Sequence, residues 1–306
     1  MRLGFALPQV GKAAGPEAVT AVSTKAEELG FDSLWVLDRL LWPIKPRAPY
    51  PAGDGSLPVQ YKSTLDPLQT LAFAAAQTKR VTVGSSVLNL PWYNPTLLAR
   101  TLTSLDVLSG GRLRVGFGMG WSPDEYEAAG MSWSGKGKRA DEFIRALKTI
   151  WTTDPVEFKG EYVHIAESII ALKPIQKPHP PIYMAAYSPG ALQRVARESN
   201  GWFPVGIPLK AVPEMFGGIQ AMAKEAGRDP SKLELIVRGN CEFSDSALSG
   251  ERADFTGTIE QIGTDIAATR EIGAHELVLD VQFAPGVESG DDYLTRMKQL
   301  WDVANK

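Results

Sequence analysis

Short apolar runs alternate with longer amphipathic stretches along the chain. The first run, Leu3–Leu7, has the length of a buried strand. Apolar residues then recur at helical spacing from Ala18 to Leu29, and Gly30 follows where a helix commonly ends. This first unit predicts a strand followed by a helix.

The same unit recurs toward the C-terminus. Further strands are predicted at Leu34–Leu37, Val81–Leu88, Leu113–Phe117, Ile182–Ala185, Trp202–Val205, Leu233–Val237 and Glu276–Val281. Further helices are predicted at Pro67–Thr78, Pro95–Leu108, Lys138–Trp151, Gly190–Arg197, Pro213–Ala226 and Thr258–Glu271. About eight strands, each followed by a helix, indicate an α/β fold of the (β/α)8 TIM-barrel type. A doubly wound open sheet remains an alternative, because the pattern does not show strand order.

Three segments interrupt the alternation. Asp38–Asp66 is rich in proline, which predicts a long ordered loop over the mouth of the barrel. Val156–Ile165 has the pattern of a hairpin. Cys241–Phe255 is polar and is predicted to be either a mobile lid or a surface loop. Because no linker is evident, we predict one domain, 1–306, with insertion loops.

Composition narrows the classes of partner. The chain is 44% hydrophobic and 22% charged, and its formal net charge is -3 without a dense basic block, so nucleic acid is not an expected partner. Cys241 is the one cysteine, and the histidines lack metal-ligand spacing with it, so no disulfide or metal is expected. The apolar run before Pro8 is too short for a signal peptide or a membrane helix. We therefore expect a cytoplasmic protein with no membrane partner.

Small residues stand at the ends of two consecutive predicted strands. The strand VTVGSSVLNLP ends in small side chains, and the exit of GGRLRVGFGMGW is almost entirely glycine and methionine. Barrel enzymes place their sites at these ends, and glycine lets the backbone approach a planar ligand. A tight turn alone is the alternative. The run GFGMGW is not a GxGxxG fingerprint, so a short-loop dinucleotide fold is not supported.

A predicted helix start near Pro189 follows Ala185, Ala186, Tyr187 and Ser188. Unpaired N–H groups and the helix dipole favour a phosphate at such a position. Ser188 as a plain N-cap is the alternative, and the two roles are compatible.

Aromatic residues follow several strand ends and either wall an apolar pocket or belong to the core: Trp42, Trp92, Tyr93, Trp121 and Trp133. The histidines are predicted to be surface or packing residues: His164 and His179 lie in connections, and His275 lies on the face opposite the site. No predicted strand interior contains a lysine, which disfavours a Schiff-base lyase or aldolase.

Several segments together resemble the bacterial luciferase-like family of flavin and deazaflavin oxidoreductases. They are LGFALPQ, AEELGFDSLWVLDR, VGSSVLNLPWYNPTLLARTLTSLDVLSGGRLRVGFGMGW, KRADEF and PIYMAAYSPGALQRVARESNGWFP, and they cover most of the chain. The resemblance is to the branch that uses the deazaflavin coenzyme F420.

This resemblance implies a set of cofactor-binding residues: Asp38, Ser86, Val87, Asn89, Gly118, Met119, Gly120, Ala185, Ala186, Tyr187 and Ser188. It also implies a cis peptide bond between Ser86 and Val87, placed against the cofactor ring. The alternative is an ordinary trans strand end.

Asp38, Arg39 and Trp42 are the candidate catalytic residues by the same resemblance. Deazaflavin members usually carry a histidine where Arg39 stands. Because arginine does not lose its proton in proteins, anion recognition is the better role for Arg39, and a rim ion pair is the alternative.

Two further positions bear on specificity. Trp121 stands where the sugar-phosphate dehydrogenase branch has glutamate, so glucose 6-phosphate is not an expected substrate. Glu125 and Arg139 are predicted to form a structural pair.

The expected function is hydride transfer between coenzyme F420 and a small organic substrate. Loop cations are candidates for contacting the anionic tail of this coenzyme, with solvated surface charge as the alternative: Lys45, Arg47, Lys62, Lys136 and Lys138. An FMN-dependent monooxygenase supplied with reduced flavin by a separate reductase is the second hypothesis. A non-catalytic flavin-binding relative is the third. Relatives are often homodimers, so a homodimer is expected.

Overall fold

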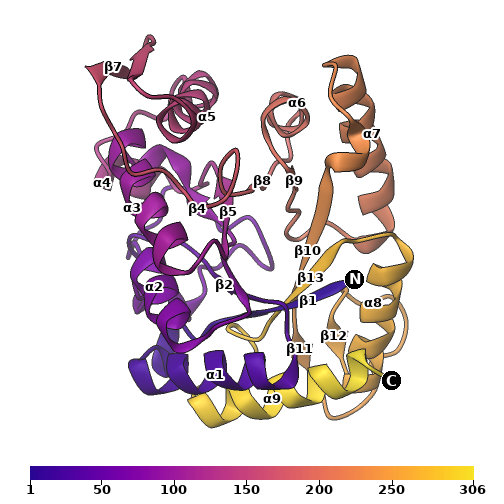
Figure 1. The fold of residues 1–306 in the computed structure, drawn as a ribbon. Helices are drawn as coiled ribbons and strands as arrows, with labels where there is room; N and C mark the ends of the chain where they lie inside the picture. The colour runs from indigo at the N-terminus through magenta and orange to yellow at the C-terminus, as the bar shows by residue number, and fades with distance from the viewer.

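A closed ring of eight parallel strands forms the centre of the computed structural model, which describes residues 1–306 (Figure 1). In ring order the strands are β3 (Thr82–Ser85), β2 (Ser33–Val36), β1 (Arg2–Ala6), β13 (Glu276–Asp280), β10 (Glu234–Asn240), β9 (Gly201–Trp202), β8 (Ile182–Met184) and β5 (Leu113–Gly118). Pairing of β3 with β5 closes the ring. The (β/α)8 prediction is confirmed, and the open-sheet alternative is wrong.

Helices surround the ring. They are α1 (Pro16–Leu29), α2 (Pro67–Gln77), α3 (Pro95–Leu108), α5 (Lys136–Thr152), α6 (Pro189–Glu198), α7 (Val212–Glu225), α8 (Ile259–Glu271) and α9 (Gly290–Ala304). The first and last of them, α1 and α9, pack side by side and join the two ends of the chain (Figure 1). The predicted ranges omitted α9 and the short α4 (Pro123–Ala128).

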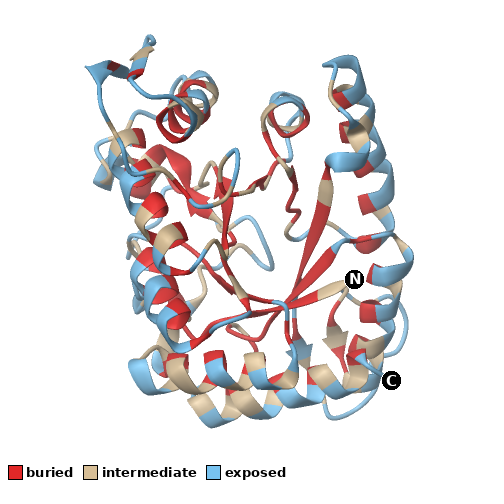
Figure 2. Ribbon diagram, viewed as in Figure 1, coloured by how far each residue is buried: buried red, intermediate tan, exposed pale blue.

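Two apolar layers arise from the alternation of side chains along each strand. Outward residues such as Leu34 and Leu277 belong to the large core between strands and helices, and Figure 2 shows the buried strands and inner helix faces. Inward residues such as Trp35 and Ile236 fill the ring itself. Gly84 is required there, because a Cβ at this position would lie 2.5 Å from the Trp35 ring.

The insertions follow the predicted pattern in outline. The hairpin is formed by β6 (Val156–Lys159) and β7 (His164–Ser168), which pair antiparallel. The proline-rich loop contains one 3-10 turn, η2 (Val59–Lys62). In the third insertion, the short strands β11 (Glu242–Phe243) and β12 (Thr256–Gly257) pair in parallel and flank a loop.

Two predicted strands have different bounds. The predicted run Val81–Leu88 is two strands, because β3 ends at Ser85 and β4 (Leu88–Asn89) resumes beyond the Ser86–Val87 bond. The predicted Trp202–Val205 strand ends at Trp202, although the Phe203 N–H still donates to the Met184 carbonyl at 2.9 Å and Val205 forms an isolated parallel bridge with Arg238.

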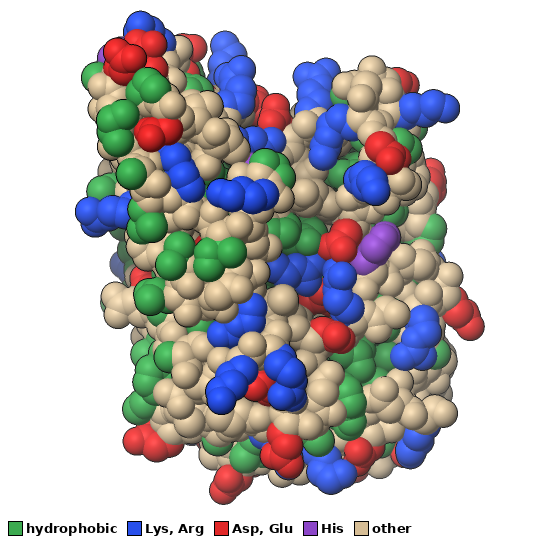
Figure 3. All heavy atoms as spheres, in the orientation of Figure 1, with side chains coloured by type: hydrophobic (Ala, Val, Ile, Leu, Met, Phe, Trp, Pro, Cys, Tyr) green, Lys and Arg blue, Asp and Glu red, His purple; other side chains and the backbone are tan.

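On the face shown in Figure 3, charged side chains of one sign do not form a continuous patch. Lysine and arginine side chains alternate with aspartate and glutamate over that face (Figure 3). None of the helices combines the length and the apolar character that crossing a bilayer requires.

Candidate active site

The connections after β2 and β4 meet at Asp38, at the carboxyl end of the barrel. The Asp38 Oδ2 atom accepts hydrogen bonds from the Asn89 backbone N–H at 2.9 Å and from the Tyr93 hydroxyl at 3.0 Å. The Asn89 side chain donates in return to the Asp38 carbonyl at 3.0 Å. Two predicted site residues from β2 and β4 are thus joined directly.

The environment of Asp38 favours its neutral form. The residue is only 4% exposed, and this burial raises the pKa of its carboxyl group from 3.8 to about 7. The two hydrogen bonds from Asn89 and Tyr93 oppose the shift. Asp38 can therefore hold or release a proton near neutral pH, which is a property that general acid–base catalysis requires.

The Ser86–Val87 peptide bond is cis, as the resemblance implied. Opposite it, Gly118 at the end of β5 makes room for the Val87 side chain, because a Cβ on Gly118 would lie 2.5 Å from it. A Cβ on Gly120, whose φ is +64°, would lie 3.3 Å from Asn89 Oδ1. Glycine at both positions lets the β5 exit approach β4 closely.

Arg238 on β10 holds the Ser86 segment from inside the barrel. Its Nη1 atom donates to the Ser86 carbonyl at 2.6 Å and to the Ser86 hydroxyl at 2.8 Å. Its Nη2 atom pairs with Asp280 on β13. Arg238 and Asp280 are not among the site residues predicted from the sequence. An arginine and an aspartate within apolar strands are an unusual signal, but their partners lie far away along the chain.

Arg39 does not face an open anion site. Its guanidinium lies 3.0 Å from Glu125 Oε2, and the two side chains are 6% and 0% exposed. The rings of Tyr61 and Trp121 lie about it, with their centroids 4.9 and 5.0 Å from the guanidinium carbon. The structure thus favours the ion-pair alternative for Arg39, in a buried rather than a rim setting.

The predicted Glu125–Arg139 pair is wrong. Glu125 contacts Arg39 instead and accepts a hydrogen bond from the Leu40 backbone N–H at 2.9 Å. Arg139 donates to the Ser132 carbonyl. The short helix α4, which sequence reasoning missed, turns Glu125 away from Arg139 and toward the loop after β2.

Helix α6 begins with free donors. Ser188 is its N-cap residue, but the serine hydroxyl makes no capping hydrogen bond. Gly190 in the first turn faces open space. Ala185 connects this loop to the β5 exit through a 2.9 Å backbone hydrogen bond to Phe117, and Tyr187 bonds the backbone of Val205. The helix start is therefore available to an anion next to the glycine exit.

The aromatic candidates separate into different environments. Trp42 packs on a small cluster with Tyr61, and Trp121 packs on Tyr50 with ring centroids 5.5 Å apart. Both therefore border the mouth. Trp133 lies apart, stacked under Lys136, whose Nζ is 3.4 Å from the ring centroid. Trp92 is half-buried.

Most of the candidate tail-binding cations already have partners. Arg47 pairs with Asp124 and Glu127. Lys62 lies 4.4 Å from the centroid of the Trp42 ring, and Lys136 lies over Trp133. Lys45 and Lys138 are exposed and remain candidates for an anionic ligand.

Two of the histidines lie in the settings predicted for them. His275 accepts a hydrogen bond from the Leu235 backbone N–H near the start of β10, which is the end opposite the site. His179 packs on Trp151, with ring centroids 5.7 Å apart. None of the eight barrel strands contains lysine, so a Schiff-base site inside the ring has no nucleophile.

The residues of this mouth fit a flat, phosphorylated ring cofactor. The two glycines let the β5 exit pack closely on Val87 and Asn89, and the start of α6 offers N–H groups to a phosphate. Two buried nitrogen atoms without a hydrogen-bond partner also lie here, Arg39 Nε and Trp42 Nε1. The fold and this site define a TIM-barrel protein with a candidate cofactor site at the carboxyl end of its strands.

The model of the luciferase-like monooxygenase family matches residues 1–275, and the chain belongs to this family. An uncharacterized protein of Mycobacterium tuberculosis is 32% identical over 223 residues, which are 71% of this chain and 78% of that protein. The F420-dependent glucose-6-phosphate dehydrogenase of Amycolatopsis mediterranei is 31% identical over 69% of this chain and 61% of its own length. The FMNH2-dependent dimethylsulfone monooxygenase of Pseudomonas putida is 34% identical over 50% of this chain and 42% of its own length.

Solved structures agree on the fold. A monooxygenase from Streptomyces bottropensis superposes with a TM-score of 0.79, at 22% identity, over 99% of this chain and 98% of that one. An F420-dependent secondary alcohol dehydrogenase superposes with a TM-score of 0.75, at 19% identity, over 98% of both chains. The family thus includes oxidoreductases and monooxygenases, with F420 or FMN as the cofactor.

Proposed function

We propose that the protein transfers a hydride between coenzyme F420 and a small organic substrate at the carboxyl end of the barrel. The observation that carries this proposal is the joined cluster of Asp38, Asn89 and Tyr93 beside the Ser86–Val87 bond. The cluster holds a carboxyl group that can retain a proton near neutral pH, and this group accepts hydrogen bonds from the segment that follows the Ser86–Val87 bond.

The predicted cofactor-binding residues and Trp42 have roles in this proposal. The backbone of Ser86, Val87, Gly118, Met119 and Gly120 would hold the ring, and the Ala185–Ser188 segment would hold the phosphate at the start of α6. When bound, the deazaflavin accepts or donates the hydride. Trp42 and Trp121 would exclude water from the mouth, which strengthens the electrostatic interactions inside it.

The proton in this proposal is held by Asp38 rather than by position 39. When hydride transfer reduces a carbonyl to an alcohol, the substrate oxygen must also gain a proton, and the reverse reaction must remove it. Arg39 cannot supply it, because its guanidinium is permanently charged and pairs with Glu125. Asp38 is the nearby group that can alternate between its two protonation states, and Tyr93 orients it.

The same Arg39–Glu125 pair supports a second candidate function. Arg39 stands where deazaflavin members usually carry a histidine, so this position does not favour the deazaflavin over reduced FMN. The dimethylsulfone monooxygenase among the relatives uses FMNH2. In that case a separate reductase would be the protein's partner.

Direct titration distinguishes the two. F420, FMN and reduced FMN are added separately to the protein, and quenching of tryptophan fluorescence is followed. We expect F420 to bind at micromolar concentration and FMN to bind at least about tenfold more weakly, a difference of about 1.4 kcal/mol. Selective binding of reduced FMN would favour the monooxygenase function over the F420-dependent one. Binding of neither would contradict both. Light scattering on the same sample tests the predicted homodimer.

A further inference from the structure

The Ser86 residue lies at the peptide bond that the proposed function places against the cofactor ring. Ser86 is 5% exposed and precedes the cis Ser86–Val87 bond, between the ends of β3 and β4. Both of its backbone polar groups are paired within the barrel. The N–H donates to the Val36 carbonyl at 2.6 Å, and the carbonyl accepts from Arg238 Nη1 at 2.6 Å. The backbone of Ser86 is therefore held from both β2 and β10.

The Ser86 hydroxyl, in contrast, is used only as an acceptor. Its Oγ atom accepts a hydrogen bond from Arg238 Nη1 at 2.8 Å and donates to no atom of the protein. An arginine side chain has five donors and no acceptor, so the hydroxyl hydrogen must point away from the guanidinium. The structure thus contains a nearly buried O–H donor without an acceptor, directly beside the cis bond.

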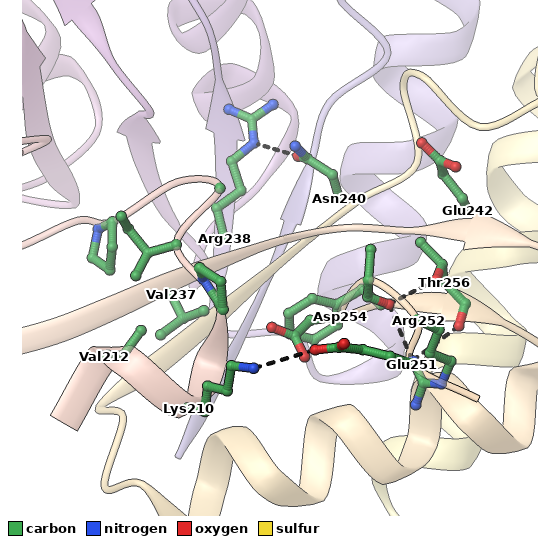
Figure 4. A pocket seen from close by; sticks show the side chains of 16 residues that line it. Lys210, Val212, Val237, Arg238, Asn240, Glu242, Glu251, Arg252, Asp254 and Thr256 are labelled. Carbon is green, nitrogen blue, oxygen red and sulfur yellow. Dashed lines mark hydrogen bonds and ion pairs between the residues drawn. The ribbon is translucent and has the colours of Figure 1, made fainter. Parts of the chain in front are cut away.

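Arg238 is held in this position by its other nitrogen atoms. Its Nη2 atom pairs with Asp280, which is 1% exposed, and its Nε atom donates to Asn240 Oδ1 at 3.1 Å. Figure 4 shows this contact between Arg238 and Asn240, which both line a pocket of about 630 Å³ at the ends of β9 and β10. Hydrogen bonds in a chain polarise one another, so a hydroxyl that accepts from a cation becomes a stronger donor.

The neighbouring serine has the opposite arrangement. Ser85 is 1% exposed, and its hydroxyl donates to the Gly116 carbonyl and accepts from the Gly116 N–H, both at 3.0 Å. Its hydrogen-bonding capacity is thus used between β3 and β5. A buried donor without an acceptor is unfavourable unless a ligand or water pairs with it. Of these two adjacent buried serines, only Ser86 has a donor left for a ligand.

We propose that the Ser86 hydroxyl donates a hydrogen bond to a carbonyl oxygen of the cofactor ring and thereby favours the reduced ring over the oxidised one. This role rests on the proposed function, which places the ring against the Ser86–Val87 bond. F420 and FMN both carry carbonyl oxygens on the pyrimidine part of the ring. Reduction adds electrons to the ring, so these oxygens become better acceptors, and a fixed donor stabilises the reduced form more. Arg238 acts as the positioning residue for the hydroxyl.

The test compares affinities for the two redox forms of whichever cofactor the wild type binds. Oxidised and reduced F420, or oxidised and reduced FMN, are titrated without oxygen into the full-length wild type and Ser86→Ala, and tryptophan fluorescence is followed. We expect Ser86→Ala to weaken binding of the reduced form about fivefold more than that of the oxidised form, which corresponds to a fall of about 20 mV in the midpoint potential of the bound two-electron couple. Redox titration of the bound cofactor measures this potential independently.

Ser85→Ala is the matched control, because it removes a buried serine hydroxyl that has no donor left for a ligand. It should lower stability and leave the ratio of the two affinities unchanged. Ser86→Cys keeps the size of the side chain but donates only weakly, so it should give an intermediate ratio. This variant also replaces Ser86→Ala if the alanine variant does not fold.

The outcomes separate this role from the proposed function. An unchanged ratio in Ser86→Ala, or an equal change of the ratio in Ser85→Ala, would overturn the role of the hydroxyl and leave the cofactor assignment intact. Binding of neither F420 nor FMN to the wild type would reject the proposed function and the role of Ser86 together.

Discussion

The Tyr93 hydroxyl donates a 3.0 Å hydrogen bond to Asp38 Oδ2, which also accepts from the Asn89 backbone N–H. This relationship joins the loop after β4 to the end of β2 at the barrel mouth. It also holds a buried carboxyl group whose protonation affects both stability and the proposed chemistry. Its consequences can be measured without identifying the substrate.

We predict that Asp38 makes the protein less stable as the pH rises from about 4 to about 7. Burial raises the pKa of Asp38 from 3.8 to about 7, so in this window the native state keeps a proton that the unfolded chain has released. The free energy of unfolding must therefore fall with rising pH and level off above about 7. Asp38→Asn keeps an acceptor for Tyr93 and removes this slope. Urea denaturation of both proteins across the window measures the difference.

The control is Tyr93→Phe. The hydrogen bond from Tyr93 lowers the pKa of Asp38, so its loss should move the end of the slope to higher pH. Parallel pH profiles for the wild type and Asp38→Asn would contradict the assignment.

The Arg39–Glu125 pair gives a second prediction, on folding of the loop. Glu125→Gln leaves a buried guanidinium without its counter-charge between Tyr61 and Trp121, and should cost about 3–5 kcal/mol in the free energy of unfolding. The glutamine oxygen can still accept from the Leu40 N–H, so faster proteolysis of the loop would follow from loss of the ion pair alone. Chemical denaturation and limited trypsin digestion measure the two effects.

Arg139→Gln is the matched comparison for that prediction. Arg139 was the partner expected from the sequence, but it contacts the Ser132 carbonyl instead. Its loss should cost well under half as much as loss of the Glu125 charge. A larger effect for Arg139 would contradict the pairing in the structure.

A third prediction concerns Arg238. Arg238→Lys keeps a cation for Asp280 but cannot donate to both atoms of Ser86 as the guanidinium does. If the Ser86–Val87 segment contacts the cofactor ring, binding of F420 or FMN should weaken by about tenfold, or about 1.4 kcal/mol. Fluorescence titration measures it.

Arg114→Lys controls for general damage to the barrel interior. Arg114 pairs with Glu234 and Glu276 inside the same ring, toward the opposite end of the strands. This variant should lower stability while leaving cofactor affinity unchanged. Equal weakening of binding by both variants would reject a local role for Arg238.

The sequence predicted the barrel well because its signals are local. An apolar run such as Leu113–Phe117, followed by glycines, indicates a strand and the position where it ends. This signal does not depend on which strands pair with it. The partners of Arg238 and Glu125 could not be predicted in this way. Asp280 is distant from Arg238 along the chain, and the Arg39–Glu125 pair depends on how α4 turns. The Trp202–Val205 prediction extended beyond β9 because Phe203 and Val205 still pair with neighbouring strands at single positions, without a continuous ladder.

The start of α6 provides the last prediction. Removal of an N-cap hydroxyl usually costs about 1 kcal/mol, because a first-turn N–H loses its acceptor. The Ser188 hydroxyl makes no such bond, so Ser188→Ala should change the free energy of unfolding by less than about 0.5 kcal/mol. Thr258→Ala is the matched case at α8, where the threonine does cap the helix, and it should show the full cost. If Ser188 instead serves a phosphate, its variant should weaken F420 or FMN binding severalfold while Thr258→Ala does not. Destabilisation of Ser188→Ala with unchanged cofactor affinity would assign it to helix capping and remove the phosphate site from this loop.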